Sequence, residues 1–375
     1  MDNENLLLKQ KREKYDNLIE MGIDPYPPRS VRTHCIQSLW DNEKDFVEKS
    51  QEVSVTGRIN AKRRQGKIGF LSLQDSTAKI QIFVRQDEVL EENYELFKLI
   101  DLGDFVQVDG KLVYTQTGEY SVLAKKLTLL SKNMRPIPTV KEKEVDGKIV
   151  RYDEFSDTET RYRKRYLDLL LNPDHKKVFE TRSRIIQGVR DYLNTRAFLE
   201  VETPILQPLY GGANARPFTT HHNTLDMTLY LRIATELYLK RLIVGGFERV
   251  YEIGKNFRNE GMDRTHNPEF TMLEVYQAYT DLGGMIELTE GMISTIAQDL
   301  FGTQKINFQG KEINLERPWR RASMLELVKE HTGEDFSDFD LDRLKAFCKA
   351  KNIEVDAFAG PGKLIAEIFD VFVED

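Results

Sequence analysis

Between residues 53 and 130 the chain repeatedly alternates apolar and polar side chains. A period of two is typical of β-strands that bury one face, and glycine and polar turns separate the runs. A helix-like segment, Val89 to Ile100, lies between the third and fourth runs. The five expected strands are Val53–Ile59, Gly69–Leu73, Lys79–Val84, Asp104–Leu112 and Tyr120–Ala124. This pattern predicts a small barrel with one helix inserted at that position.

Five strands with a helix after the third are typical of the OB fold, which binds single strands by stacking bases on aromatic rings. Phe70 on the second strand offers a ring, and Gln81 on the third offers amide donors and acceptors to a base edge. A basic run without acidic residues precedes them, and it contains Arg58, Lys62, Arg63, Arg64 and Lys67. Taken alone, this segment leaves two interpretations open: a nucleic-acid surface, or a core phenylalanine beside a solvated loop.

Composition restricts the other possibilities. The 375 residues suffice for two or three domains, and 40% hydrophobic with 31% charged residues is ordinary for a globular protein. Neither a membrane span nor a secretory signal at residues 1–20 is expected. Only Cys35 and Cys348 are present, without CxxC spacing, so we expect no zinc site or disulfide framework and a cytoplasmic location. The net charge of −7 does not exclude nucleic-acid binding, because local clusters decide it.

A second constellation surrounds a polar turn between residues 257 and 271. The flanking runs, Phe247–Ile253 and Phe270–Tyr276, alternate and are expected to form an antiparallel hairpin. We expect it to hold Arg258 and Glu260 opposite Glu274 and Tyr276.

Each side chain of this constellation suits a nucleotide or a cation. Arg258 suits bidentate contact with a phosphate, and Phe270 can stack on a purine. Glu236, Glu260 and Glu274 would provide carboxylates for a cationic ligand. Surface salt bridges between the strands are the alternative for each residue taken singly.

The sequence divides into four expected regions: a helical extension at 1–50, the barrel at 51–135, a linker at 136–172 and a second domain at 173–375. Arg161–Leu170 is expected to be one helix, and a long amphipathic helix begins near Pro173. Neither an alternating βαβ order nor a Gly-rich phosphate loop is present in the second domain. We therefore expect an α+β multidomain protein.

Together these segments resemble the class II aminoacyl-tRNA synthetases, and among them the bacterial-type lysyl-tRNA synthetases, over nearly the whole chain. The helix up to Pro204 resembles motif 1, which builds the dimer interface in this family, and Phe257–Tyr276 resembles motif 2. The most specific segments are Arg161–Leu170, Gly211–Phe218, Tyr230–Leu242 and Glu248–Tyr279. The resemblance implies an OB-fold anticodon-binding domain followed by the antiparallel sheet and helices of a class II catalytic domain.

The resemblance implies a role for each matching position. Arg258 resembles the arginine that contacts the α-phosphate and the amino-acid carboxylate, and Glu260 the motif 2 glutamate near ATP. These two are the implied catalytic residues. His266 and Asn267 match the loop that meets the ATP phosphates, and Phe270 the ring that stacks on adenine.

Lysine and the anticodon have their own implied positions. Gly212 and Glu236 match positions that receive the lysine α-amino group, and Glu274 and Tyr276 match those that reach its ε-ammonium. Residues matching Phe70 and Gln81 contact the central anticodon base, and Arg63 matches a further anticodon position. The implied partners are lysine tRNA, ATP with Mg²⁺, L-lysine and a second copy of the chain.

One departure stands out. Nothing after Gly310 resembles motif 3 or the acidic metal ligands that precede it in this family, so we expect a catalytic domain lacking its C-terminal part, without metal ligands and with little activity by itself. Two alternatives remain open. An aspartyl- or asparaginyl-type synthetase also pairs an OB barrel with a class II domain, although Glu274 and Tyr276 favour a cationic substrate. A tRNA-binding or regulatory module without catalysis is the other.

Overall fold

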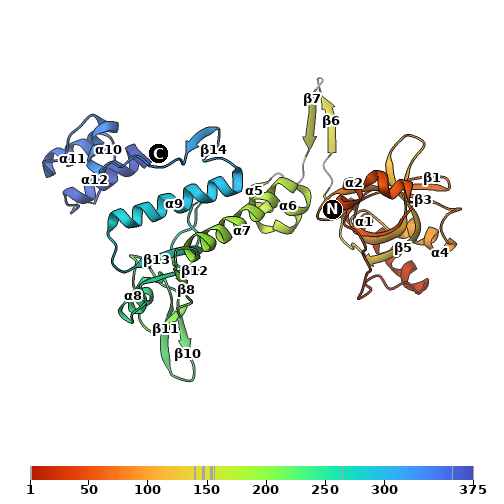
Figure 1. Ribbon diagram of the computed structural model, residues 1–375, viewed down its shortest axis with the longest axis horizontal. Helices are drawn as coiled ribbons and strands as arrows, with labels where there is room; N and C mark the ends of the chain where they lie inside the picture. The colour runs from red at the N-terminus through yellow and green to blue at the C-terminus, as the bar shows by residue number, and fades with distance from the viewer. Residues whose placement is uncertain are drawn as a thin grey trace. The chain divides into compact units, whose positions relative to one another are not determined.

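The structure is a computed structural model that describes residues 2–138, 141–145, 148–152, 155, 157–263, 265–356 and 358–374. The chain divides into two compact units, residues 1–173 and 174–375 (Figure 1). The first unit contains one large hydrophobic core, and the second contains two smaller ones. The finer domain bounds expected from the sequence stay proposals.

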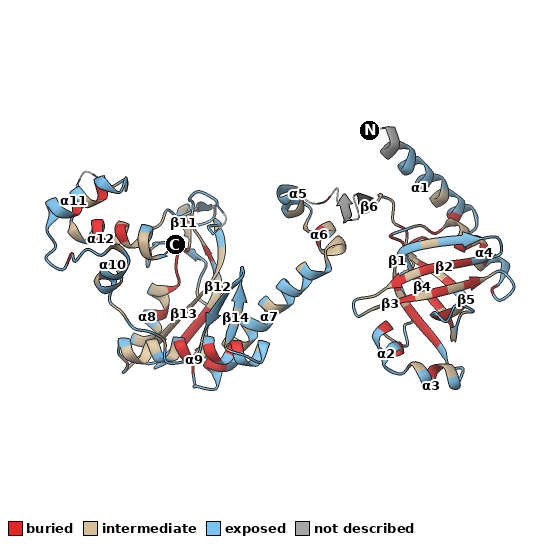
Figure 2. Cartoon of the chain, turned by 90° about the horizontal axis from the view of Figure 1, so that it is seen from above, coloured by how far each residue is buried: buried red, intermediate tan, exposed pale blue. Residues whose placement is uncertain are grey.

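The predicted barrel is confirmed. Its strands form a closed barrel in the order β1-β2-β3-β5-β4, and helix α4 (Glu91–Leu99) lies between β3 and β4 in the chain. The strands are β1 (Glu52–Gln65), β2 (Ile68–Gln74), β3 (Lys79–Arg85), β4 (Phe105–Tyr114) and β5 (Tyr120–Ser131). Buried and less buried positions alternate along β2 and β3 (Figure 2), as the period of two predicts.

Three helices precede the barrel: α1 (Asp2–Glu20), α2 (Ile36–Asp41) and α3 (Glu43–Glu48). Leu18 of α1, Ile36 and Leu39 of α2 and Phe46 of α3 are buried in the same core as the barrel strands. The N-terminal helices are therefore packed parts of the first unit.

Residues 136–172, expected to be a linker, contain regular structure where they are described. Strands β6 (Lys141–Val145) and β7 (Lys148–Tyr152) pair antiparallel, and parts of the expected linker lie outside the described residues. The single helix expected over Arg161–Leu170 is wrong, because the structure has α5 (Thr158–Arg163) and α6 (Arg165–Leu171). The break at Lys164 lets Arg161 and Arg165 both pair with Asp168, which is fully buried.

The second unit is built around an antiparallel pair, β12 (Arg249–Phe257) and β13 (Glu269–Gln277). A short strand, β8 (Leu199–Glu200), adds parallel to β12. Helix α7 (Pro173–Asn194) contributes Tyr192 and Leu193 to the core of this sheet, and α9 (Leu282–Phe301) packs Leu288 and Met292 against it. This sheet and its helices agree with the expected fold class.

The expected register of the β12–β13 hairpin was wrong. The first strand does not end at Ile253 but continues to Phe257, so Glu274 lies opposite Glu252 and Tyr276 opposite Val250. Arg258 and Glu260 follow the strand in the connecting loop. The sequence suggested an early end because residues 254–256 include no β-branched or aromatic residue. Gly254 is required there, since a Cβ would lie 2.2 Å from Nη2 of Arg232.

The second unit contains further strands and helices. Strands β9 (Leu206–Gln207), β11 (Met227–Leu231) and β10 (Thr219–His222) form a small sheet, which helix α8 (Glu236–Val244) follows. A hairpin of β14 (Lys305–Phe308) and β15 (Lys311–Asn314) comes next. Helices α10 (Met324–Thr332), α11 (Leu341–Ala350) and α12 (Pro361–Phe369), with a π-helical turn at Asp370–Glu374, have their own core. Among the helices described, none combines the length and apolar character needed to cross a bilayer.

Candidate functional site

Arg258 has an unpaired buried donor. Its backbone N–H donates to the Pro268 carbonyl at 2.9 Å, which closes the end of the β12–β13 hairpin. The guanidinium carbon lies 5.1 Å from the centre of the Phe270 ring, within cation–π range. The Nε atom is buried and has no hydrogen-bond partner among the described residues. An unsatisfied buried donor costs about 1–3 kcal/mol, so this position favours an anion that can accept from Arg258.

Glu260 is tied to a loop that comes from elsewhere in the sequence. Its carboxylate accepts from the Arg216 N–H at 3.3 Å, and the Asn259 N–H donates to the Arg216 carbonyl at 2.7 Å. The Gly211–Phe218 loop and the segment after β12 therefore lie against each other.

His266 lies in the turn between the two strands and is exposed. Its Nδ1 lies 2.8 Å from an Asp263 oxygen, and its backbone N–H donates to the same carboxylate at 2.7 Å. Hydrogen bonds from the Thr265 N–H and from His266 lower the pKa of Asp263. Asp263, which the sequence did not single out, thus orients His266, and the neighbouring Asn267 is exposed.

Glu274 and Tyr276 form a joined polar pair on β13. The Tyr276 hydroxyl donates to one Glu274 oxygen at 3.0 Å, and the Thr235 N–H donates to the other at 2.9 Å. Burial and the Glu274 carboxylate raise the pKa of Tyr276 above its usual range, so the phenol stays a donor. Both partners of Glu274 are neutral, and among the described residues no lysine, arginine or histidine forms an ion pair with it. The Glu274 carboxylate therefore offers a place for a cationic ligand.

Gly212 and Glu236 are brought together next to this pair. Gly212 has φ +88°, and a Cβ there would lie 2.9 Å from the Glu236 Cβ. A side chain at this position would fill the space beside the Glu236 carboxylate. Glu236 begins α8 and pairs with Lys240 at 2.6 Å. The charge of Glu236 also contributes to the raised pKa of Tyr276. The carboxylates of Glu236 and Glu274 therefore both lie close enough to the Tyr276 phenol to influence it.

A buried ion pair supports the hairpin from behind. Arg232 and Glu252 pair while only 2% and 3% exposed, and the Thr203 hydroxyl donates to Glu252 at 2.7 Å. Arg232 also donates to the Lys255 carbonyl at 2.9 Å, and its own carbonyl accepts the Phe257 N–H at 2.9 Å. This network fixes the strand end directly before Arg258. Nothing in the sequence signals that these two charged residues are buried.

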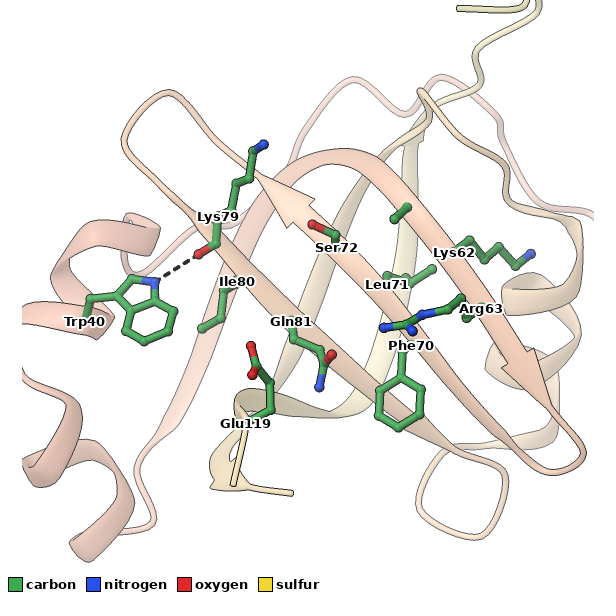
Figure 3. A pocket seen from close by; sticks show the side chains of 11 residues that line it. Trp40, Lys62, Arg63, Phe70, Leu71, Ser72, Lys79, Ile80, Gln81 and Glu119 are labelled. Carbon is green, nitrogen blue, oxygen red and sulfur yellow. Dashed lines mark hydrogen bonds between the residues drawn. The ribbon is translucent and has the colours of Figure 1, made fainter. Parts of the chain in front are cut away.

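The barrel presents a second candidate site on the outer face of β2 and β3 (Figure 3). Phe70 and Phe83 are cross-strand partners whose rings stack 5.0 Å apart at 6°. Both are half-buried, which excludes the alternative that Phe70 belongs to the core. Gln81 on the same face donates to the Ser121 hydroxyl at 3.0 Å. Phe83 was missed, although its spacing of two from Gln81 on a strand places both on one face.

The basic run preceding Phe70 is divided by the structure. Arg63, the register partner of Phe70, is exposed, as are Arg64 and Lys67. Lys62 instead turns to the end of α4, where its ammonium donates to the Phe97 and Ile100 carbonyls at 2.6 Å. Burial lowers the pKa of Lys62 to about 8.

Arg58 also has a contact within the protein, because its guanidinium carbon lies 4.3 Å from the centre of the Phe105 ring. Two of the five cations therefore have structural contacts rather than a free surface. Three remain available to phosphates.

The described part of the chain contains no cluster of side chains suited to bind a metal ion. No group of three or more histidine, cysteine, aspartate or glutamate side chains lies close enough there to hold one.

Both domains match known protein families. Residues 157–358 match the family of tRNA synthetases class II (D, K and N), and residues 53–130 match the OB-fold nucleic acid binding domain. The chain belongs to the class II tRNA synthetase family of this type, with an OB-fold domain preceding the synthetase domain.

Individual relatives extend the match over the whole chain. A lysine–tRNA ligase of Carboxydothermus hydrogenoformans is 46% identical over 372 residues, which cover 99% of this chain and 73% of the relative. Lysine–tRNA ligases of Syntrophomonas wolfei and Lactococcus lactis are 48% and 47% identical, covering 98% of this chain and 72% and 74% of theirs.

Proposed function

We propose that this chain provides the lysine- and ATP-binding site and the anticodon-binding domain of an enzyme that attaches L-lysine to lysine tRNA through lysyl-adenylate. The observation that carries the proposal is the Glu274 carboxylate, whose donors within the described part of the chain are the neutral Thr235 N–H and Tyr276 hydroxyl. A lysine ε-ammonium would supply the missing positive charge. The identity with lysine–tRNA ligases over nearly the whole chain supports the same substrate.

In the proposed reaction, an oxygen of the lysine carboxylate attacks the α-phosphorus of ATP, and the bond to the bridging oxygen breaks to release pyrophosphate. Arg258 would hold the carboxylate and the α-phosphate together, using the Nε donor that has no protein partner. Phe270 would stack on adenine, with Glu260, His266 and Asn267 around the nucleotide. Catalysis here is orientation and charge stabilisation, since the attacking carboxylate is already ionised.

The second step transfers the lysyl group to a hydroxyl at the end of the tRNA, with AMP as the leaving group. Gly212 and Glu236 would receive the lysine α-amino group, because Gly212 leaves space beside the Glu236 carboxylate. Mg²⁺ would enter bound to ATP. In the barrel, Phe70 would stack on the central anticodon base, with Gln81 and Arg63 beside it.

A homodimer through α7 and β8 belongs to the proposal. Val178 and Ile185 on α7 are 65% and 39% exposed, and they border a hollow of about 720 Å³ between α7, β12 and β13. Apolar surface of this kind is typical of an interface. Sedimentation equilibrium measures the association directly. A cytoplasmic location stays a prediction.

Amino-acid titration separates the proposal from its alternatives. We expect calorimetry to detect L-lysine binding and no L-aspartate or L-asparagine binding, because a substrate carboxylate would face two glutamates. Aspartate binding as tight as lysine binding would favour an aspartyl-type synthetase. A chain that binds lysine tRNA but no amino acid would favour the RNA-binding module.

The low activity of the 375 residues by themselves also stays a prediction. Displacement at phosphorus develops charge on both the attacking and the leaving side, and Arg258 is the one arginine side chain that the proposal places at the phosphates. We expect little or no lysine-dependent ATP–pyrophosphate exchange above the enzyme-free background. Clear exchange with lysine would contradict this prediction while supporting the proposed substrate.

A further inference from the structure

Trp40 is an exposed indole held rigidly beside the anticodon-binding face. It lies on α2 and is 38% exposed. Its Nε1 donates to the Lys79 carbonyl at the start of β3, at 2.9 Å. Its ring packs against the buried Tyr120, with centroids 5.0 Å apart at 59°. An exposed indole that is fixed from two sides has little conformational entropy left to lose when a ligand stacks on it.

This indole lines the same hollow as the residues proposed for the central anticodon base. The hollow has a volume of about 180 Å³, and both Trp40 and Phe70 border it. Figure 3 shows Trp40 at one end and Phe70 at the other, with Ile80, Gln81 and Glu119 between them. A hollow this small is below the roughly 300–1,000 Å³ of a small-molecule cleft, so it suits a flat group such as a base.

The length of the face leaves room for more than one base. From Lys79, next to Trp40, to Phe83, next to Phe70, β3 rises about 13 Å at about 3.3 Å per residue. Stacked nucleotides are about 3.4 Å apart, so bases bound at the two ends would be splayed apart. Splayed bases stacked on separate aromatic side chains are typical of single-stranded RNA recognition.

We propose that Trp40 is a second stacking platform, which binds a nucleobase next to the one on Phe70. The ligand is single-stranded RNA, and Glu119 offers a carboxylate to N–H donors on the edge of this second base. The inference rests on the proposed function, since it assigns a neighbouring nucleotide of the same anticodon loop.

Fluorescence tests the contact directly. The chain has two tryptophans, so Trp319→Phe leaves Trp40 as the single reporter. Titration with an RNA stem-loop carrying the lysine anticodon is expected to quench its emission. Anisotropy of a labelled copy of the same stem-loop measures the affinity of variants that lack Trp40. Trp40→Ala should weaken binding about 10-fold and Trp40→Phe less, since stacking on an aromatic side chain tolerates a smaller ring.

Abasic stem-loops separate stacking from a structural role. A stem-loop without the base on one side of the central nucleotide should abolish both the quench and the penalty of Trp40→Ala. A stem-loop without the central base should abolish the penalty of Phe70→Ala instead. If Trp40→Ala weakens binding equally with every stem-loop, or if binding causes no quench, the inference is overturned. The anticodon assignment would survive that result as long as Phe70→Ala still weakens binding. Stem-loop binding that neither substitution affects would overturn the anticodon assignment and the inference together.

Discussion

Glu274→Gln is expected to weaken L-lysine binding by about 100-fold, because removing one member of a buried, hydrogen-bonded charge pair costs about 2–5 kcal/mol. The proposed ε-ammonium would lose its only anionic partner on β13. Glutamine keeps the size of the side chain and an oxygen that can accept from the Thr235 N–H, which donates to Glu274 at 2.9 Å. Calorimetric titration of each purified variant measures the change.

Two comparisons sharpen this result. Glu269→Gln removes a carboxylate from the same strand, but Glu269 is 57% exposed and already pairs with Lys255 at 3.3 Å. Lysine affinity should not change in that control. Norleucine, which has the lysine chain without the ammonium, should bind the original chain weakly and discriminate little between it and Glu274→Gln. Equal losses of lysine affinity in Glu274→Gln and Glu269→Gln would show that the effect comes from the net charge of the protein and not from recognition of the ammonium by Glu274.

Arg232→Met is expected to lower the free energy of unfolding of the second unit by about 3–5 kcal/mol, since it leaves Glu252 buried with its charge unpaired. Glu252 is 3% exposed, and the Thr203 hydroxyl would be its remaining partner. Because the Arg232 side chain also donates to the Lys255 carbonyl at 2.9 Å, the end of β12 and the loop that contains Arg258 should loosen as well.

Urea unfolding, followed by Trp319 in a Trp40→Phe background, reports on the second unit alone. The double variant Arg232→Met/Glu252→Leu removes both charges, so it should lose less than the sum of the two single substitutions. Additive losses would mean that the two side chains do not interact. A loss below about 1 kcal/mol for Arg232→Met would place the pair among ordinary surface ion pairs.

Local periodicity predicted the barrel and its outer face from the sequence. Phe70 and Gln81 alternate with residues whose burial in the core follows from the same period, such as Leu71 and Ile82. The sequence also predicted the helix between the third and fourth strands, which the structure has as α4.

Features that depend on contacts distant in sequence were not predictable from local patterns. The end of β12 was misplaced because Gly254 weakens the strand pattern, and the Arg232 side chain, which follows β11, explains that glycine. The burial of Asp168, which pairs with Arg161 and Arg165 across the break between α5 and α6, was not predictable either, because nothing in the local pattern marks this charged residue as buried. Trp40 comes to the barrel face from a helix outside the barrel.

The most direct test of the central claim compares two non-hydrolysable sulfamoyl analogues, one of lysyl-adenylate and one of aspartyl-adenylate. Both present the same adenosine to Arg258 and Phe270 and differ only in the amino-acid side chain. We predict that the lysyl analogue binds and raises the unfolding midpoint, while the aspartyl analogue binds at least about 100-fold more weakly, because its carboxylate would face Glu274 unpaired. Equal binding of the two, or tighter binding of the aspartyl analogue, would contradict the assignment of lysine as substrate.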